Sequence, residues 1–332
     1  MNRNQSRAAL LECWRDTRDC WRRLPNKAFF FGLLVAWVAL FQFWGNSILG
    51  YVHTSSLFAW TWNLYDLPDG NDAHGKIVPL VVLGLLWWKR HKLLAQSPAL
   101  WWPGIFILTG ALALHVFGFL VQQPYISLVA LFAGLYGLMG LAWGRAWLRH
   151  SLFPFWLFVF SIPLAGHGQM VTFPLQELVS WLTEKCAHGL GIDVIRVGTG
   201  LFDPSGTYQY EVAAACSGIH SLAATFLLAA IYGGVRFPSL PKRILLMALA
   251  VPLAVLGNLA RMLTIIVAAT FGGQAAGNYV HEGGPLGLLS LVPYVPVFIG
   301  LLLAGRWLEK SSEPRISQNE RDLKTEISHE VV

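Results

Sequence analysis

Charged residues are scarce in this chain of 332 residues. Asp, Glu, Lys and Arg make up 13% of it, whereas 55% is hydrophobic and 15 residues are Trp. Long runs without any charge are typical of polytopic membrane proteins, so the composition argues against a soluble enzyme. The expected fold class is therefore all-α and polytopic, with one helical membrane domain over residues 28–304.

Motifs of several enzyme classes are also missing. The four cysteines form neither a Cys-x-x-Cys pair nor a zinc-ligand pattern, so we expect no disulfide framework, no metal and no cofactor. His281-Glu282 has no second histidine four residues on, and no Gly-x-Ser-x-Gly elbow occurs. The apolar spans hold no paired aspartates. These absences weigh against a metalloprotease, a serine hydrolase and an intramembrane aspartyl protease.

Basic residues cluster in the short loops between apolar runs. The net charge of +6 would suit a nucleic acid, but this distribution follows the positive-inside rule and reports membrane topology instead. No nucleic-acid partner is expected, and the lipid bilayer is the partner that the pattern indicates. The expected localisation is the inner, cytoplasmic membrane, with several crossings of the bilayer.

The first 27 residues form a basic amphipathic segment. They contain seven Lys or Arg, and Leu10, Trp14, Trp21 and Leu24 recur near helical spacing. We expect a cytoplasmic helix that lies on the membrane surface. The segment is too long and too basic for the start of a signal peptide. Residues 305–332 are expected to form a disordered cytoplasmic tail.

About eight transmembrane helices are predicted, most of them near the roughly 17–25 residues that a spanning helix needs. With the N-terminus inside, the loop charges place both termini in the cytoplasm and put residues 166–217 and His281 outside. The predicted spans are 28–45, 77–88, 100–120, 126–144, 151–165, 218–235, 244–271 and 286–304. In the span at 126–144, glycines at small-residue spacing favour close helix packing.

The longest outer segment, 166–217, is expected to hold a small helix and a β-hairpin. A helix along the membrane surface is predicted for 174–190, where five apolar residues share one face: Leu175, Leu178, Val179, Leu182 and Cys186. Residues 192–202 and 207–212 are rich in β-branched and aromatic side chains around the turn sequence Asp-Pro-Ser-Gly. This pattern predicts a hairpin that leads the chain directly to Cys216.

Cys216 lies in the stretch Glu-Val-Ala-Ala-Ala-Cys-Ser-Gly-Ile-His-Ser, residues 211–221. An apolar segment begins at Ile219, so Cys216 is expected at the start of a membrane helix and at the water boundary. The amides of a helix N-terminus favour a thiolate, which is the reactive form of cysteine, so Cys216 is the candidate nucleophile. The structural alternative is a small apolar residue that fills the helix start.

Arg261 is unusual because it falls inside a predicted span. A guanidinium there costs at least about 2.5–3.5 kcal/mol on insertion scales, so it should face a polar cavity or a partner. Asn258, three residues earlier, lies on the same helix face and can orient it. The structural alternative is an arginine satisfied by backbone carbonyls.

His281 lies in the predicted outer loop before the last span, in the stretch Val-His-Glu-Gly-Gly-Pro. A histidine beside flexible glycines can act as a base or an ion-pair partner near neutral pH, although a loop histidine can also be incidental. The helix of Cys216 begins outside and the helix of Arg261 ends outside. The loop charges alone therefore bring all three residues toward the outer face.

These motifs closely resemble the exosortase/archaeosortase family of membrane cysteine transpeptidases. The resemblance rests on the cysteine motif, the later Asn-x-x-Arg and the later His, in a chain of about eight spans. His-Gly-Lys-Ile-Val-Pro-Leu at 74–80, followed by Leu-Trp-Trp-Lys-Arg, is similar to the family's first motif, and Ile162-Pro163 to its proline before the hairpin. The likeness covers most of the predicted membrane domain.

By this resemblance, Cys216 is the nucleophile and Arg261 and His281 complete a triad. The supporting residues are Asn258, Ser217, His220 and Glu282. Position 220 departs from the family, which often has Arg or Asn there, and His220 is a competing base one turn after Cys216. A base four residues into the helix lies about 6 Å deeper and has poorer access to water, which favours His281.

The activity that the resemblance implies is acyl transfer through a thioester. Cys216 attacks a peptide carbonyl, His281 pairs with the thiolate or protonates the leaving amine, and Arg261 binds the oxyanion or the substrate. The implied partners are membrane-anchored substrate proteins with a C-terminal sorting signal of the PEP-CTERM kind, cleaved on the periplasmic or exterior side. The alternative is a transporter or export subunit of an extracellular polysaccharide pathway, for which Cys216 is dispensable.

Overall fold

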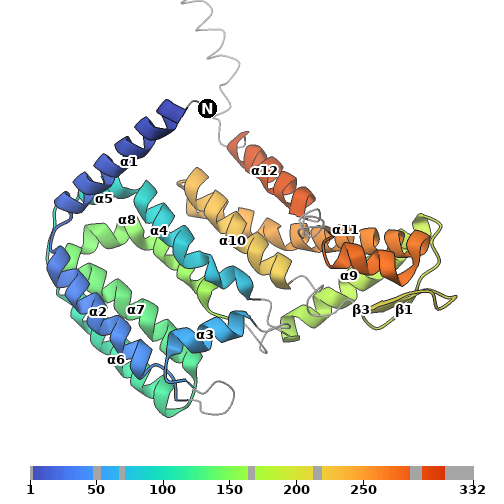
Figure 1. Ribbon diagram of the computed structural model, residues 1–332, viewed down its shortest axis with the longest axis horizontal. Helices are drawn as coiled ribbons and strands as arrows, with labels where there is room; N and C mark the ends of the chain where they lie inside the picture. Colours follow the sequence, from blue (N-terminus) through green and yellow to red (C-terminus); the bar gives the residue numbers. More distant parts are fainter. Residues whose placement is uncertain are drawn as a thin grey trace, which may run out of the picture. The chain divides into compact units, whose positions relative to one another are not determined.

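The computed structural model describes residues 3–47, 54–66, 72–163, 169–211, 219–284 and 294–310, which are mostly helical (Figure 1). The chain divides into two compact units. The first joins Met1–Gln176 with Val212–Leu227, and the second joins Glu177–Glu211 with Leu228–Val332. Two helices, α9 (Gln169–Gly189) and α10 (Ile219–Arg236), contribute residues to both units.

The first unit is helical in all of its described elements. An amphipathic helix opens it, as predicted, and apolar helices follow. Besides the parts of α9 and α10, its elements are α1 (Arg3–Arg23), α2 (Lys27–Phe43), α3 (Leu57–Tyr65), η1 (Ala73–Lys76), α4 (Val78–Trp88), α5 (Arg90–Leu94), α6 (Pro103–Leu120), α7 (Pro124–Trp143), α8 (Arg145–Trp156) and η2 (Leu157–Ser161).

Helices α6 and α7 form the closest helix pair of the first unit. Glycines allow their approach, because a Cβ on Gly104 would lie 2.8 Å from the carbonyl oxygen of Gly137. On another side of α7, Gly134 leaves room for the ring of Trp37, whose Nε1 donates to the Leu131 carbonyl at 3.0 Å. The prediction that small residues in this span serve helix packing is confirmed.

The second unit carries a small sheet of three strands, the last two of which form the predicted hairpin. Strands β1 (Ile195–Val197), β2 (Gly200–Phe202) and β3 (Gln209–Glu211) pair antiparallel in that order. The predicted first strand, 192–202, is wrong because Gly198 interrupts it with a φ of 61°, which turns the chain back on itself. The predicted turn at Asp203 is confirmed, since its N–H donates to the Tyr208 carbonyl at 3.1 Å.

Helix α9 covers the predicted surface helix, with a buried face that only partly matches the predicted one. Val179, Ser180, Thr183 and Ala187 are fully buried, whereas Leu178 is 41% exposed. Small side chains allow the sheet to approach closely, and the hydroxyls are satisfied locally: Thr183 Oγ1 donates to the Val179 carbonyl at 2.8 Å. The face packed against protein is made mostly of small residues, and Val179 belongs both to it and to the predicted apolar face.

Fewer helices than predicted have the length and composition of a membrane span. Three do so among the described residues, α6, α7 and α11 (Leu240–His281), and the bent pair of α1 and α2 would add a fourth. A helix overlaps each of the eight predicted spans, but several are short: α2 has 17 residues and α4 has 11. Eight crossings therefore remain a prediction.

Helix α11 is broken near its end. Gly273 has a φ of 70° and a ψ of −172°, outside the helical region and in a part of backbone space that is essentially restricted to glycine. The break separates a long apolar arm, 240–272, from a short arm, 274–281. Helix α12 (Tyr294–Lys310) packs along the long arm, and Lys242 Nζ donates to the Leu308 carbonyl at 2.8 Å.

Candidate active site

The break in α11 brings two of the predicted site residues together. Arg261 Nη2 donates to the backbone carbonyl of His281 at 3.3 Å. Twenty residues separate them, and a straight helix would place them about 30 Å apart at 1.5 Å per residue. The short arm must therefore fold back past Gly273 toward Arg261.

This contact satisfies part of the hydrogen-bonding need of a guanidinium in an apolar helix. A guanidinium carries five N–H donors, and the described residues include one carbonyl acceptor for Arg261. The sequence allowed two interpretations of Arg261, a functional arginine or one satisfied by backbone carbonyls. This bond agrees with the second, since its acceptor is a backbone carbonyl. It also holds the guanidinium beside His281, where a functional arginine would have to lie.

His281 ends a helix, so its prediction as a loop residue is wrong. It is the last residue of α11, and the N–H of Glu282 donates to the Asn278 carbonyl at 2.8 Å. The two glycines that follow form a turn, since Gly283 and Gly284 have φ values of 90° and 62°. His281 therefore lies at a helix end next to a turn, and its side chain is half-buried.

Strand β3 is attached to the break in α11. The backbone N–H of Gln209 donates to Gln274 Oε1 at 2.8 Å, and Gln274 Nε2 donates back to the Gln209 carbonyl at 3.3 Å. Tyr210 Oη donates to the Gln274 carbonyl at 3.0 Å, and a Cβ on Gly277 would overlap this hydroxyl. The strand that precedes the cysteine motif is thus fixed to the arm that carries His281.

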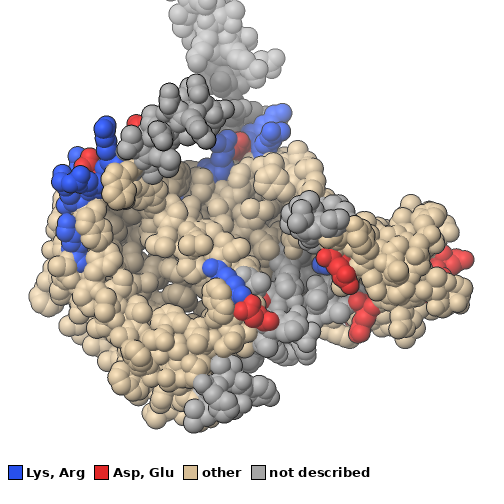
Figure 2. Space-filling model, viewed as in Figure 1, with Lys and Arg blue, Asp and Glu red and all other residues tan. Residues whose placement is uncertain are grey.

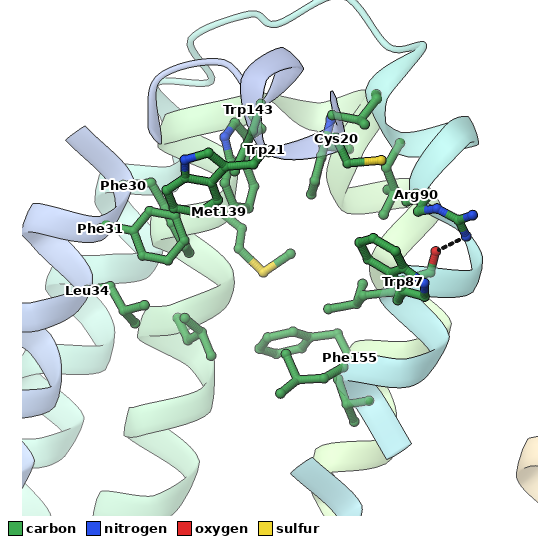
Figure 3. Close-up of a pocket in the computed structure, with 18 of the residues that line it drawn as sticks. Cys20, Trp21, Phe30, Phe31, Leu34, Trp87, Arg90, Met139, Trp143 and Phe155 are labelled. Atoms are coloured by element: carbon green, nitrogen blue, oxygen red, sulfur yellow. Dashed lines mark hydrogen bonds between the residues drawn. The ribbon is translucent and has the colours of Figure 1, made fainter. Parts of the chain in front are cut away.

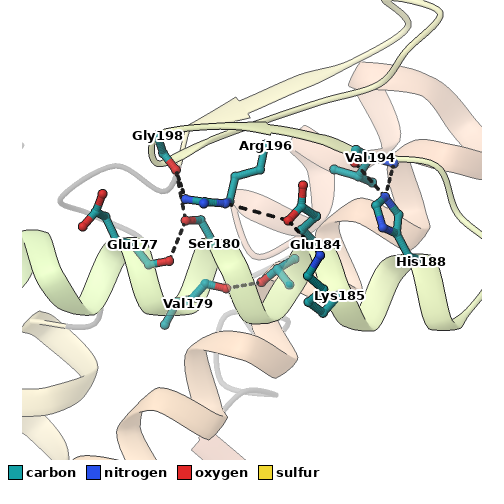
Figure 4. Close-up of polar contacts among 10 residues, drawn as sticks. Glu177, Val179, Ser180, Glu184, Lys185, His188, Val194, Arg196 and Gly198 are labelled. Carbon is teal, nitrogen blue, oxygen red and sulfur yellow. Dashed lines mark hydrogen bonds and ion pairs between the residues drawn. The ribbon is translucent and has the colours of Figure 1, made fainter.

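Polar contacts hold the sheet on α9 (Figure 4). Arg196 Nη1 donates to the Gly198 carbonyl at 2.8 Å, and its Nε lies 3.8 Å from Glu184 Oε2. Ser180 Oγ lies 3.3 Å from the same carbonyl, and His188 Nε2 lies 2.8 Å from the Val194 carbonyl. These side chains brace both ends of β1, so the sheet is a rigid support for β3.

Asn258 lies on the same helix as Arg261, one turn earlier, as the spacing predicted, and it is 5% exposed.

The cysteine motif lies outside this description. Cys216 and Ser217 fall outside the described residues, and so does the side chain of His220, whose backbone belongs to the first turn of α10. Among the described ranges, no group of three or more His, Cys, Asp or Glu could hold a metal ion.

The motif at 74–80 lies in the first unit and has a packing role there. A Cβ on Gly75 would overlap the ring of Tyr65, whose hydroxyl donates to the carbonyl of Ser161, next to Ile162-Pro163. Burial raises the pKa of Tyr65, so this hydroxyl stays a donor. Lys76 Nζ lies 4.5 Å from the ring centroid of Trp62. The two pieces of sequence that resembled the family therefore meet around Tyr65.

The fold and the site define a helical membrane protein in which a small sheet is braced on a broken apolar helix that pairs Arg261 with His281. The chain belongs to the transmembrane exosortase family, whose model (Exosortase_EpsH) matches residues 60–298. The matched range contains the motif around Tyr65, the cysteine motif, Arg261 and His281. Comparisons with curated proteins and with solved structures found no match.

Proposed function

We propose that this member of the exosortase family is a membrane-embedded cysteine protease or transpeptidase. It cleaves a C-terminal sorting signal from exported proteins near the outer face of the membrane. The observation that carries the proposal is the bond from Arg261 to His281 across the break at Gly273. This bond joins the Arg261 guanidinium to the backbone carbonyl of His281 and so places a cation next to a residue that can act as a general acid or base. Arg261 lies in the apolar arm of α11, where a charge without a use or a partner is costly.

The chemistry follows from these groups. The Cys216 thiolate attacks the scissile carbonyl, so that a C–S bond forms and the carbonyl electrons move onto oxygen. Arg261 stabilises this oxyanion with N–H donors, and the intermediate collapses as the C–N bond breaks. His281 protonates the departing amine. Water or an amine then attacks the thioester, and the thiol is released.

The attachment of β3 supports Cys216 as the third member. Cys216 follows Glu211, the end of β3, by five positions in the sequence. Gln274 and Tyr210 fix β3 to the short arm of α11, so the strand that precedes the cysteine motif is attached to the arm that carries His281. The position just before α10 also favours a thiolate.

The decisive experiment compares cysteines. Cys216→Ala should abolish processing of a co-expressed protein with a C-terminal sorting signal, while the variant still accumulates in the membrane. Cys186→Ala is the matched control, because Cys186 is half-buried on α9 and has no catalytic role in the proposal. In the wild type, hydroxylamine should release the cleaved substrate as a hydroxamate, which identifies a thioester.

Continued processing by Cys216→Ala would refute covalent catalysis. If export of a polysaccharide also persisted in that variant, the transporter alternative would take its place. Loss of processing in both variants would point to a packing role for the cysteines.

A further inference from the structure

A cavity of about 520 Å³ lies in the first unit, between the N-terminal helices and α4, α7 and α8. Figure 3 shows Trp21, Phe31 and Leu34 along one wall and Trp87 and Phe155 along the other. Its walls are almost wholly aliphatic and aromatic. The volume is in the range of about 300–1,000 Å³ that is usual for sites of small ligands.

An ion pair closes one side of this cavity. The Arg90 Nε donates to Asp16 Oδ2 at 2.9 Å. Its Nη1 donates to the Trp87 carbonyl at 3.0 Å (Figure 3). Arg90 therefore links α1 to α5 beside the cavity. Its guanidinium already donates to protein acceptors, so we do not expect it to bind a ligand.

Positive charge gathers on the helices that bound one side of the cavity. Residues 12–27 and 89–92 hold eight Lys or Arg and three Asp or Glu, and Figure 2 shows the basic side chains gathered over α1 and α5. Lys27 lies next to the aromatic wall, with its Nζ 3.2 Å from the Trp21 carbonyl and 5.6 Å from the centroid of the Trp21 ring. An ammonium has three donors, and this bond uses one.

We propose that the cavity holds one acyl chain of an anionic phospholipid, with the headgroup at Lys27 and the basic side chains of α1. An apolar cavity in a bilayer fills with hydrocarbon more readily than with water. Basic pockets between membrane helices on the cytoplasmic side are known to bind acidic headgroups. The positive rim and the apolar interior together match a molecule with one charged end and a long hydrocarbon tail.

The dimensions argue against a peptide helix as the occupant. A spanning helix about 30 Å long and 10 Å wide fills roughly 2,400 Å³, more than four times the cavity. A single acyl chain needs no such space and can enter sideways from the leaflet. The inference concerns the first unit alone and does not depend on the proposed catalytic function.

The test uses the full-length protein purified in detergent and loaded with phosphatidylglycerol or phosphatidylcholine of identical acyl chains. Native mass spectrometry should show one phosphatidylglycerol retained per protein, and a clear preference over phosphatidylcholine. Leu86→Trp fills the cavity and should weaken retention at least about tenfold, because excluding even two methylene groups has that effect. Leu80→Trp is the matched control, since Leu80 is on the same helix, is 68% exposed and does not line the cavity.

The headgroup contact is tested separately. Lys27→Gln should reduce the preference for phosphatidylglycerol about fivefold, whereas Lys185→Gln, on the second unit, should leave it unchanged. Equal retention of the two lipids by the wild-type protein would by itself overturn the proposal. This outcome does not depend on whether Leu86→Trp folds. Undiminished retention by a folded Leu86→Trp would overturn the cavity as the site, as would co-purification of a protein subunit that occupies it.

Discussion

Replacing Gly273 by alanine tests the geometry on which the candidate active site depends. At a φ of 70° and a ψ of −172°, a residue with a Cβ is strained by about 1–3 kcal/mol. A strain of that size shifts the balance between the broken and the straight helix by about 5- to 150-fold. In the straight helix, Arg261 and His281 would be about 30 Å apart instead of 3.3 Å.

Two measurements on Gly273→Ala check this reasoning. Processing of a co-expressed sorting-signal substrate should fall, by at most the factor that the strain gives. In a cysteine-free background, the distance between spin labels at Leu256 and Tyr279 reports whether the short arm of α11 folds back along the long arm. The two positions are 47% and 53% exposed. Their separation should rise toward the roughly 35 Å expected for 23 residues of straight helix.

Gly191→Ala is the matched control. Gly191 also has a positive φ, 77°, with open space around its Cβ position, and it lies in a turn far along the chain from α11. It should carry a comparable strain without a change in the label distance. If Gly273→Ala kept both the wild-type distance and full processing, the break would not be what positions the site. Equal loss in both variants would assign the effect to general destabilisation.

Four further predictions concern the same site and its topology. Arg261→Lys should lower processing about 10²- to 10³-fold despite the retained charge, because lysine lacks the planar fork of donors; near-normal activity would reduce Arg261 to a generic cation. His281→Ala should cost about 10²- to 10⁴-fold while His220→Asn is tolerated, and the reverse pattern in the processing assay would transfer the base role to His220. Gln274→Ala removes two hydrogen bonds to β3, so it should lower the rate of processing and reduce the free energy of unfolding in detergent by about 1 kcal/mol. An unchanged rate would show that activity does not require β3 to be fixed to α11. Reporter fusions at Gly206 and at the C-terminus should fall on opposite sides of the membrane, outside and inside, and a shared side would contradict the topology.

Local patterns in the sequence determined much of this protein. Scarcity of charge and long apolar runs predicted a helical membrane protein, and a helix is present at every predicted span. The Asp-Pro-Ser-Gly turn predicted the reversal between β2 and β3, since its residues are suited to turns by themselves. Arg261 was marked as a site residue by its cost in an apolar helix, which depends on composition alone.

Tertiary contacts decided the rest. Gly272-Gly273 directly follows the predicted span 244–271 and permits a turn, but it does not fix the path of the chain. The positive φ of Gly273 is set by what the two arms of α11 contact, β3 among them. The buried face of α9 is made of Ser180, Thr183 and Ala187, whose small size matters only once a sheet packs there. Hydropathy periodicity compares residues one or two turns apart. It carries no information on contacts such as that of Arg261 with His281, which join residues twenty positions apart through the path of the backbone.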